Sequence, residues 1–209
     1  MNDEDLITEP AGKVTAELKE RRSRFIASLA VAGTEEAAKE FIRSVSQKHS
    51  QANHNCWAYR VGSQKATEYF SDDGEPAGTA GKPILGAIQR VGLTNTVIVI
   101  TRYFGGVKLG VRGLIEAYGK CASLAVEKAG TTKKRLARMA RIMTSYEHQN
   151  TVLAMLKEVE VEGGSVAAEY GAEVTLDVPV PLSFASQAEE LFGGFLGRGL
   201  IASWRWEDA

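Results

Sequence analysis

The 209-residue sequence lacks any uninterrupted apolar stretch near the roughly 20 residues that a membrane-spanning helix needs. Its first residues, MNDEDLITEPAG, are acidic and contain no apolar signal-peptide core. We therefore expect a cytoplasmic protein that has no membrane partner. Cysteine is also scarce: Cys56 and Cys121 are the only two, and neither belongs to a CxxC pair. This pattern predicts reduced, buried thiols rather than a disulfide framework.

A strong overall charge is absent as well, because the formal net charge is -1. No global field therefore attracts nucleic acid. The charges are unevenly distributed, since residues 147–209 carry three basic and eleven acidic side chains. This asymmetry leaves two interpretations open, an ordinary solvated surface or a chain with one basic and one acidic face. In the second case Glu158, Glu160 and Glu162 could bind a regulatory protein.

The pattern of apolar residues in the first part of the chain predicts a mixed α+β domain. Residues 12–31 alternate as two strands joined by a basic turn, and Thr34 is expected to cap a helix that ends near Lys48. The further elements expected are strands at 55–61 and 66–71, a helix at 84–91, a strand at 96–101 that is buried on both faces, and a helix at 114–129.

The segment TTKKR after Gly130 is expected to be a polar linker. The order predicted beyond it is a strand at 136–146, a helix at 149–159, strands at 162–169 and 172–180, a helix at 183–195 capped by Ser183, and a strand at 201–206. Strand–helix–strand–strand–helix–strand is the split βαβ, or ferredoxin-like, arrangement. We therefore predict two domains, residues 1–132 and residues 133–209.

The loop SDDGEPAGTAGKP at residues 71–83 concentrates Asp72, Asp73 and Glu75 within four positions. Three carboxylates could hold a hard cation and, with His54, support a metal-assisted hydrolase. They could equally cap the following helix or pair with arginines. The spacing does not match a calcium-binding loop, so neither a metal site nor a cofactor is predicted.

The segment TRYFGGVKLGVRG at residues 101–113 follows a buried strand and leads into a helix. Its glycines match neither the dinucleotide nor the P-loop fingerprint. A strand, a glycine-rich loop and a helix N-terminus together still form a natural anion site. Arg102, Lys108 and Arg112 add positive charge, and Tyr103 and Phe104 are interleaved with these basic residues. RNA phosphate is therefore a candidate ligand, with Tyr103 near a base. The alternative is that the aromatic side chains belong to the core and the cations are solvated.

The segment HSQANHNCWAYR at residues 49–60 places His54 and Cys56 on the same face of a strand. A zinc site would need four ligands, and no second pair of suitable spacing is present. Neighbouring residues on one strand rarely bring a histidine base against a thiol. We therefore expect Cys56 to be buried, and His54 to be a polar site residue or a hydrogen-bond partner of the acidic loop.

Three strings occur here in a characteristic order: HNCWAYR, FSDDGEPAGTAGKPIL and TVIVITRYFGGVKLGVRGLIEAYG. By these strings the chain resembles the YigZ/IMPACT family. The resemblance implies a first domain with the left-handed βαβ unit of domain IV of elongation factor G, and a second domain similar to domain V. It implies a translation-associated regulatory protein that binds RNA or the ribosome, without established catalysis. The eukaryotic members bind an activator of an initiation-factor kinase, but partner surfaces can change while the fold stays the same.

The resemblance also carries over motif residues by position, namely His54, Asp72, Asp73, Gly74, Glu75, Pro76, Gly78, Thr79, Gly81, Arg102, Tyr103, Gly105, Gly106, Gly110 and Tyr118. All of these except Pro76 and Tyr118 form the predicted binding site, together with Lys108 and Arg112. No catalytic residue is predicted. Arg112 stands where many relatives have a small residue, which speaks against a tight steric role there and adds positive charge at the helix N-terminus.

Overall fold

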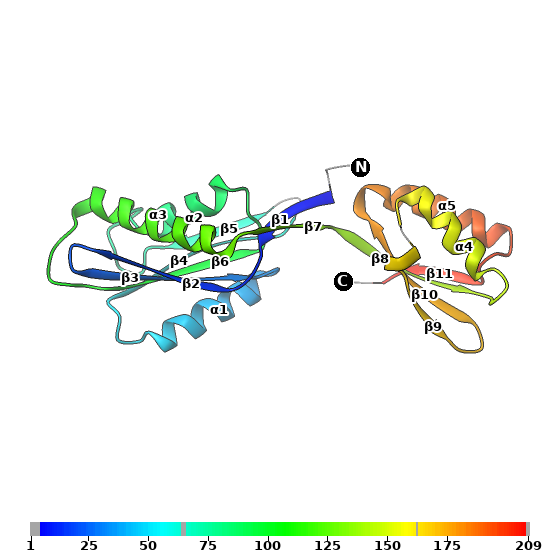
Figure 1. Cartoon of the computed structure of the whole chain (residues 1–209), viewed down its shortest axis with the longest axis horizontal. Helices are drawn as coiled ribbons and strands as arrows, with labels where there is room; N and C mark the ends of the chain where they lie inside the picture. The colour runs from blue at the N-terminus through cyan, green and yellow to red at the C-terminus, as the bar shows by residue number, and fades with distance from the viewer. Residues whose placement is uncertain (1–4, 64–65, 162, 208–209) are drawn as a thin grey trace. The chain divides into compact units, whose positions relative to one another are not determined.

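The computed structural model describes residues 5–63, 66–161 and 163–207. Its contacts divide the chain into two compact units, one of Ile7–Lys134 and one of Met1–Leu6 with Arg135–Ala209 (Figure 1). The predicted boundary followed residue 132, whereas the contacts divide the chain after Lys134. They also assign the segment before Ile7 to the C-terminal unit. None of the described helices combines the length and the apolar character required to span a bilayer.

The N-terminal unit is built on a five-stranded antiparallel sheet. Its strands, in spatial order, are β2 (Val14–Glu20), β3 (Ser23–Val31), β6 (Thr96–Tyr103), β4 (His54–Val61) and β5 (Thr67–Ser71). The central strand β6 is buried from Thr96 to Arg102, as its β-branched composition predicted. The candidate binding site lies at the end of this sheet where β6 ends and β4 begins.

Helices cover both faces of this sheet (Figure 1). One face packs against α1 (Glu35–Lys48), and the other packs against α2 (Gly81–Arg90) and α3 (Gly110–Ala129). Thr34 caps α1 as predicted, because its side chain accepts a hydrogen bond from the Ala37 N–H at 3.2 Å. The strands serve both layers through alternation: Cys56 belongs to the core beneath α2 and α3, whereas Tyr59 belongs to the core beneath α1.

Three features of this unit differ from the expectation. Helix α2 begins three residues before Ile84 and α3 four residues before Leu114, because their glycine-rich first turns have no apolar periodicity. The segment TTKKR is a strand, β7 (Thr131–Arg135), that pairs with β1 (Leu6–Pro10). Its polar, largely exposed side chains gave no strand signal, so the prediction of a linker was wrong.

The C-terminal unit has a four-stranded antiparallel sheet in the order β11-β8-β10-β9. Its elements along the chain are β8 (Ala137–Thr144), α4 (Gln149–Met155), the 3-10 turn Leu156–Val159, β9 (Ala167–Tyr170), β10 (Val174–Pro181), α5 (Ala185–Gly197) and β11 (Ser203–Trp206). This order confirms the ferredoxin-like arrangement. The handedness of the N-terminal βαβ unit and the likeness to elongation factor G stay predictions.

Two local expectations in this unit were wrong. Ser183 does not cap α5, because it lies in the 3-10 turn Leu182–Phe184 and its hydroxyl donates to Asp5 Oδ2 at 2.5 Å. The strand expected at 162–169 begins only at Ala167, after a 3-10 turn at Gly163–Ser165. The first predicted residue of that strand, Glu162, lies outside the described residues.

Candidate binding site

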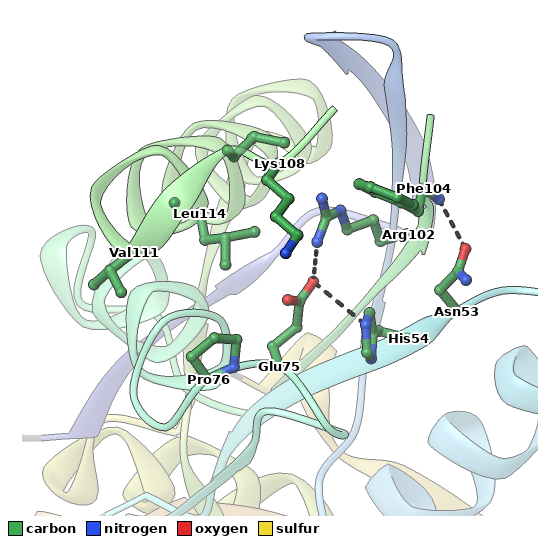
Figure 2. Close-up of a pocket in the computed structure, with 11 residues that line it drawn as sticks. Asn53, His54, Glu75, Pro76, Arg102, Phe104, Lys108, Val111 and Leu114 are labelled. Atoms are coloured by element: carbon green, nitrogen blue, oxygen red, sulfur yellow. Dashed lines mark hydrogen bonds and ion pairs between the residues drawn. The ribbon is translucent and has the colours of Figure 1, made fainter. Parts of the chain in front are cut away.

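A cavity of about 400 Å³ opens where the two predicted loops meet (Figure 2). It lies at the start of β4, the acidic loop, the end of β6 and the first turns of α3. Its lining consists of Asn53, His54, Glu75, Pro76, Arg102, Phe104, Lys108, Leu109, Gly110, Val111 and Leu114. The cavity therefore combines an apolar wall with a cluster of charged side chains.

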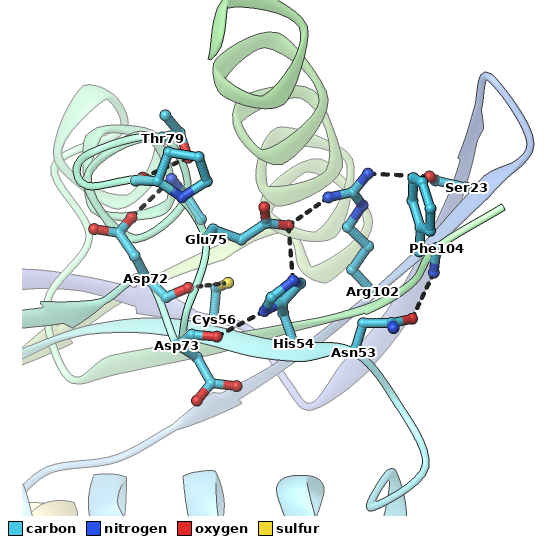
Figure 3. A network of polar contacts seen from close by, with 12 residues as sticks. Ser23, Asn53, His54, Cys56, Asp72, Asp73, Glu75, Thr79, Arg102 and Phe104 are labelled. Carbon is cyan, nitrogen blue, oxygen red and sulfur yellow. Dashed lines mark hydrogen bonds and ion pairs between the residues drawn. The ribbon is translucent and has the colours of Figure 1, made fainter. Parts of the chain in front are cut away.

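The charged cluster is centred on a buried ion pair between Arg102 and Glu75 (Figures 2 and 3). Arg102 Nη1 lies 2.7 Å from Glu75 Oε1, and their side chains are only 6% and 3% exposed. The Tyr118 hydroxyl donates to the same oxygen at 2.8 Å, and His54 Nε2 lies 3.9 Å from it. Burial raises the pKa of Tyr118, which keeps the phenol protonated as a donor. In the part of the chain that the structure describes, Glu75 Oε2 has no hydrogen-bond partner.

The guanidinium of Arg102 is held on several sides. Its Nη2 donates to the Ser23 hydroxyl at 3.2 Å, and its central carbon lies 5.4 Å from the ring centroids of both Phe25 and Phe104. Its Nε is buried and has no hydrogen-bond partner within the described residues. Arg102 is therefore held in place on several sides, although one of its buried donors is left without a partner among the described residues.

Asp72 organises the acidic loop rather than facing the cavity (Figure 3). Its Oδ1 accepts from the N–H groups of Ala80 and Gly81 at 2.9 and 2.8 Å, and its Oδ2 accepts from the Gly78 N–H at 2.8 Å. Burial alone would raise the pKa of Asp72, but these three hydrogen bonds outweigh it and lower the pKa. Asp72 thus caps the N-terminus of α2, although it does not directly precede this helix in the sequence. Capping of the following helix is one of the alternatives that the sequence left open for this loop.

Replacing Asp72 by asparagine is expected to lower the free energy of unfolding by about 1–2 kcal/mol at pH 7, since an amide cannot accept all three hydrogen bonds. The pKa of Asp72 is lower in the folded protein than in the unfolded chain, where it is about 3.9. The carboxylate therefore stabilises the fold fully above pH ~3.9. This stabilisation is lost as the pH falls through the folded-state pKa. Urea unfolding of both proteins at pH 7 and pH 3 should show a smaller difference in acid. An unchanged difference would contradict the assignment.

Asp73 makes different contacts from Asp72. Asp73 Oδ2 accepts from the Asn55 N–H at 2.6 Å, and the Asp73 carbonyl lies 2.7 Å from His54 Nδ1. Because a carbonyl only accepts, Nδ1 is the protonated nitrogen of His54 and Nε2 faces Glu75. The expected hydrogen bond between His54 and the acidic loop is confirmed. Among residues 5–63, 66–161 and 163–207, no three metal-ligating side chains converge, so the alternative of a metal-assisted hydrolase finds no ligand set there.

Cys56 is a structural thiol. Both cysteines are buried, as predicted, and burial raises the pKa of Cys56 to about 12. Its Sγ lies 2.9 Å from the Asp72 carbonyl and 3.3 Å from the Tyr118 hydroxyl, and it donates to one of them at a time. A thiol with this pKa remains protonated at neutral pH, so it cannot serve as a nucleophile.

The second loop ends at the N-terminus of α3, where the N-cap residue Leu109 makes no capping hydrogen bond with its side chain. Gly110 and Val111, in the first turn, line the cavity, and Lys108 points into it (Figure 2). Upstream, Gly105 lies so close to the β2–β3 turn that a Cβ atom would stand 2.0 Å from the Arg22 carbonyl oxygen. The loop therefore packs closely against the β2–β3 turn, and the helix N-terminus faces the cavity. This is the strand–loop–helix geometry expected of an anion site.

Tyr103 and Arg112 are among the predicted residues that do not line the cavity. Tyr103 extends to the opposite side of β6 from Arg102, and its hydroxyl lies 3.0 Å from His49 Nδ1. The side chain of Arg112 is 93% exposed and pairs with Glu116 at 2.9 Å. Other predicted residues belong to the two loops without lining the cavity. The Thr79 hydroxyl donates to the Pro76 carbonyl. The others are the glycines Gly74, Gly78, Gly81 and Gly106.

Phe104 is the aromatic residue that the predicted site omitted. Phe104 is 44% exposed and lines the cavity. It follows Arg102 by two residues and therefore lies on the same side of the chain. This alternation was the signal that could have identified it in place of Tyr103. The other lining residues outside the predicted set are Asn53, Pro76, Leu109, Val111 and Leu114, of which Pro76 was carried over only as a motif residue.

The chain is similar to several known proteins. The model of the Impact N-terminal domain matches residues 21–126. IMPACT family member YvyE of Bacillus subtilis is 41% identical over 66% of this chain, and the match covers 63% of that protein. IMPACT family member YigZ of Escherichia coli is 37% identical over 82% of this chain and 84% of that protein. A solved structure of a hypothetical protein matches 98% of both chains at 32% identity, with a TM-score of 0.68.

Proposed function

The chain belongs to the IMPACT family, and on that premise we propose that it is a translation-associated protein that binds single-stranded RNA across the mouth of the cavity. One observation carries the proposal: the N-terminus of α3, whose N-cap residue makes no side-chain hydrogen bond, opens at the same cavity as Lys108 and Arg102. The resemblance in sequence implies a translation-associated role, and this geometry suggests the ligand.

The charge balance at the cavity favours an anionic ligand. Arg102 neutralises Glu75 within their buried pair, so the ammonium of Lys108 remains as positive charge in excess. The first turn of α3 adds backbone N–H groups and the positive end of the helix dipole. A phosphate at the rim would thus meet Lys108 and the helix N-terminus, with Arg112 exposed on the same turn. RNA presents such phosphates at regular intervals along its backbone.

Binding of a regulatory protein through the acidic C-terminal half has less support. Glu160 is already paired with Arg135 at 2.5 Å, and Glu162 lies outside the described residues. The two ideas differ in the part of the chain that holds the partner. If residues 135–209 alone retained the partner, the RNA proposal for the N-terminal cavity would fail.

Replacing Lys108 by alanine is expected to reduce the affinity for a short single-stranded RNA about fivefold at 0.1 M salt. It should also reduce the slope of log K against log salt by about 0.7, since one phosphate contact is lost. Fluorescence anisotropy over a range of salt concentrations measures both quantities. Lys48→Ala removes the same charge from the exposed end of α1, on the opposite face of the sheet, and serves as the matched control.

The two variants decide the proposal together. Lys48→Ala should bind with nearly wild-type affinity and slope. Equal effects of the two substitutions would show that only the overall charge matters, and affinity that does not depend on salt would rule out phosphate binding at this rim.

A further inference from the structure

We infer that the cavity itself receives one base of the bound RNA, and that its polar floor selects guanine. The inference rests on the proposed function, because it adds a base-recognition step to the binding of the RNA backbone. Three features of the cavity carry it: an exposed aromatic ring, an apolar wall, and two hydrogen-bond acceptors on the floor, Glu75 Oε2 and His54 Nε2 (Figure 2). Among the described residues Oε2 has no partner, and Nε2 lies 3.9 Å from Glu75 Oε1.

The wall of the cavity suits a flat, apolar-faced group rather than a phosphate. Pro76, Leu109, Val111 and Leu114 form this wall, and a phosphate gains nothing from contact with such side chains. A volume of about 400 Å³ lies within the range typical of small-molecule pockets. Nucleobases removed from a single strand are commonly held between apolar and aromatic side chains.

Phe104 supplies the stacking surface. The Arg102 guanidinium lies 5.4 Å from its ring centroid, yet 44% of the residue remains exposed. Its backbone is fixed because the Phe104 N–H donates to Asn53 Oδ1 at 2.8 Å. A ring held in place before binding loses little conformational freedom when a base stacks on it. Phe104 is thus a preorganised platform at the edge of the cavity.

The floor of the cavity presents acceptors. Glu75 Oε1 already accepts from Arg102 and Tyr118, which leaves Oε2 free among the described residues. His54 donates through Nδ1 to the Asp73 carbonyl, so in the neutral ring Nε2 is an acceptor as well. A ligand group that meets this floor must therefore bring hydrogen-bond donors, and a second anion would be repelled by Glu75.

Guanine is the base that best fits these acceptors. Its Watson–Crick edge carries two adjacent donors, the ring N1–H and the N2 amino group, whereas adenine, cytosine and uracil each carry only one donor group on that edge, beside one or two acceptors. Guanine also places the O6 acceptor beside these donors, where the ammonium of Lys108 points into the same cavity (Figure 2). Selection for guanine follows from matching two donors and one acceptor at once.

The test compares five-nucleotide RNAs that carry guanine, inosine, adenine, cytosine or uracil at the central position in an otherwise uridine chain, by anisotropy at one salt concentration. Guanine should bind about tenfold tighter than the other standard bases, as a bidentate contact provides. Inosine, which lacks the N2 amino group, should be intermediate. Phe104→Leu should weaken binding of the guanine RNA about tenfold through lost stacking.

Phe70→Leu is the matched control, because Phe70 is also 44% exposed but lies on β5 and does not line the cavity. It should bind as the wild type does. Equal affinity for all five RNAs, with Phe104→Leu no weaker than Phe70→Leu, would overturn base recognition. If Lys108→Ala still lowered the salt slope, the proposed RNA binding would survive that result. Failure of the wild type to bind any of the RNAs would overturn both.

Discussion

Replacing Arg102 by methionine is expected to lower the free energy of unfolding of the N-terminal unit by about 3–5 kcal/mol, because the substitution leaves the buried carboxylate of Glu75 without its counter-ion. The Tyr118 hydroxyl would remain as a donor, but one neutral hydrogen bond does not compensate a buried charge. The loss should appear in urea unfolding at neutral pH as a lower midpoint with an unchanged slope.

A double variant distinguishes the energetic cost of an unpaired buried charge from the net contribution of the ion pair to stability. Arg102→Met combined with Glu75→Leu removes both charges, so it should recover most of the stability that the single variant loses. Arg112→Ala is the exposed comparison: it breaks an ion pair whose side chains are 93% and 64% exposed, and should change stability little. If Arg102→Met were as mild as Arg112→Ala, the pair would not be the buried anchor of the site.

Replacing Gly105 by alanine should cost stability near the upper end of the ~1–3 kcal/mol typical of overpacking. The added Cβ would lie 2.0 Å from the Arg22 carbonyl oxygen and 2.2 Å from its carbon, so the backbone of the loop or of the β2–β3 turn must move. Because Phe104 precedes Gly105 directly, such a movement should also displace the stacking platform. Thermal unfolding and binding of the guanine RNA together measure both consequences.

Gly86→Ala is the control for this substitution. Gly86 lies inside α2, and a Cβ there would meet nothing within 4 Å. The change should stabilise the protein by up to about 1 kcal/mol, since alanine is the better helix former. A Gly105→Ala variant with wild-type stability would show that the loop is free to move away from the β2–β3 turn.

The architecture was predictable where local patterns agree with long-range packing. The capped helix α1, the buried strand β6 and the ferredoxin-like order of the C-terminal unit follow from hydrophobic periodicity and capping chemistry. The pairing of β1 with β7 did not follow, because it joins segments about 125 residues apart and the largely exposed, polar side chains of β7 show no apolar alternation. Such a ribbon is defined by backbone hydrogen bonds, which every sequence can make.

The candidate site was predictable as two loops but not in its detail. The residue types indicated that the acidic loop and the glycine-rich loop would carry the chemistry. They did not indicate that Asp72 binds three backbone N–H groups or that Glu75 pairs with Arg102, because both contacts depend on how the loop folds back. Side chains alternate along an extended chain, so Phe104 lies on the same side as Arg102 and Tyr103 on the other. Because Arg102 lines the cavity, this alternation identifies Phe104 as the aromatic residue of the site.

Backbone amide chemical shifts would show directly whether RNA occupies this cavity. Isotope-labelled protein would be titrated with the pentanucleotide that contains guanine while its amide spectrum is recorded. RNA bound in the cavity should cause the largest changes at Asn53, Phe104, Gly110 and Val111, which line it. No change at these four amides, or changes confined to residues 135–207, would contradict it.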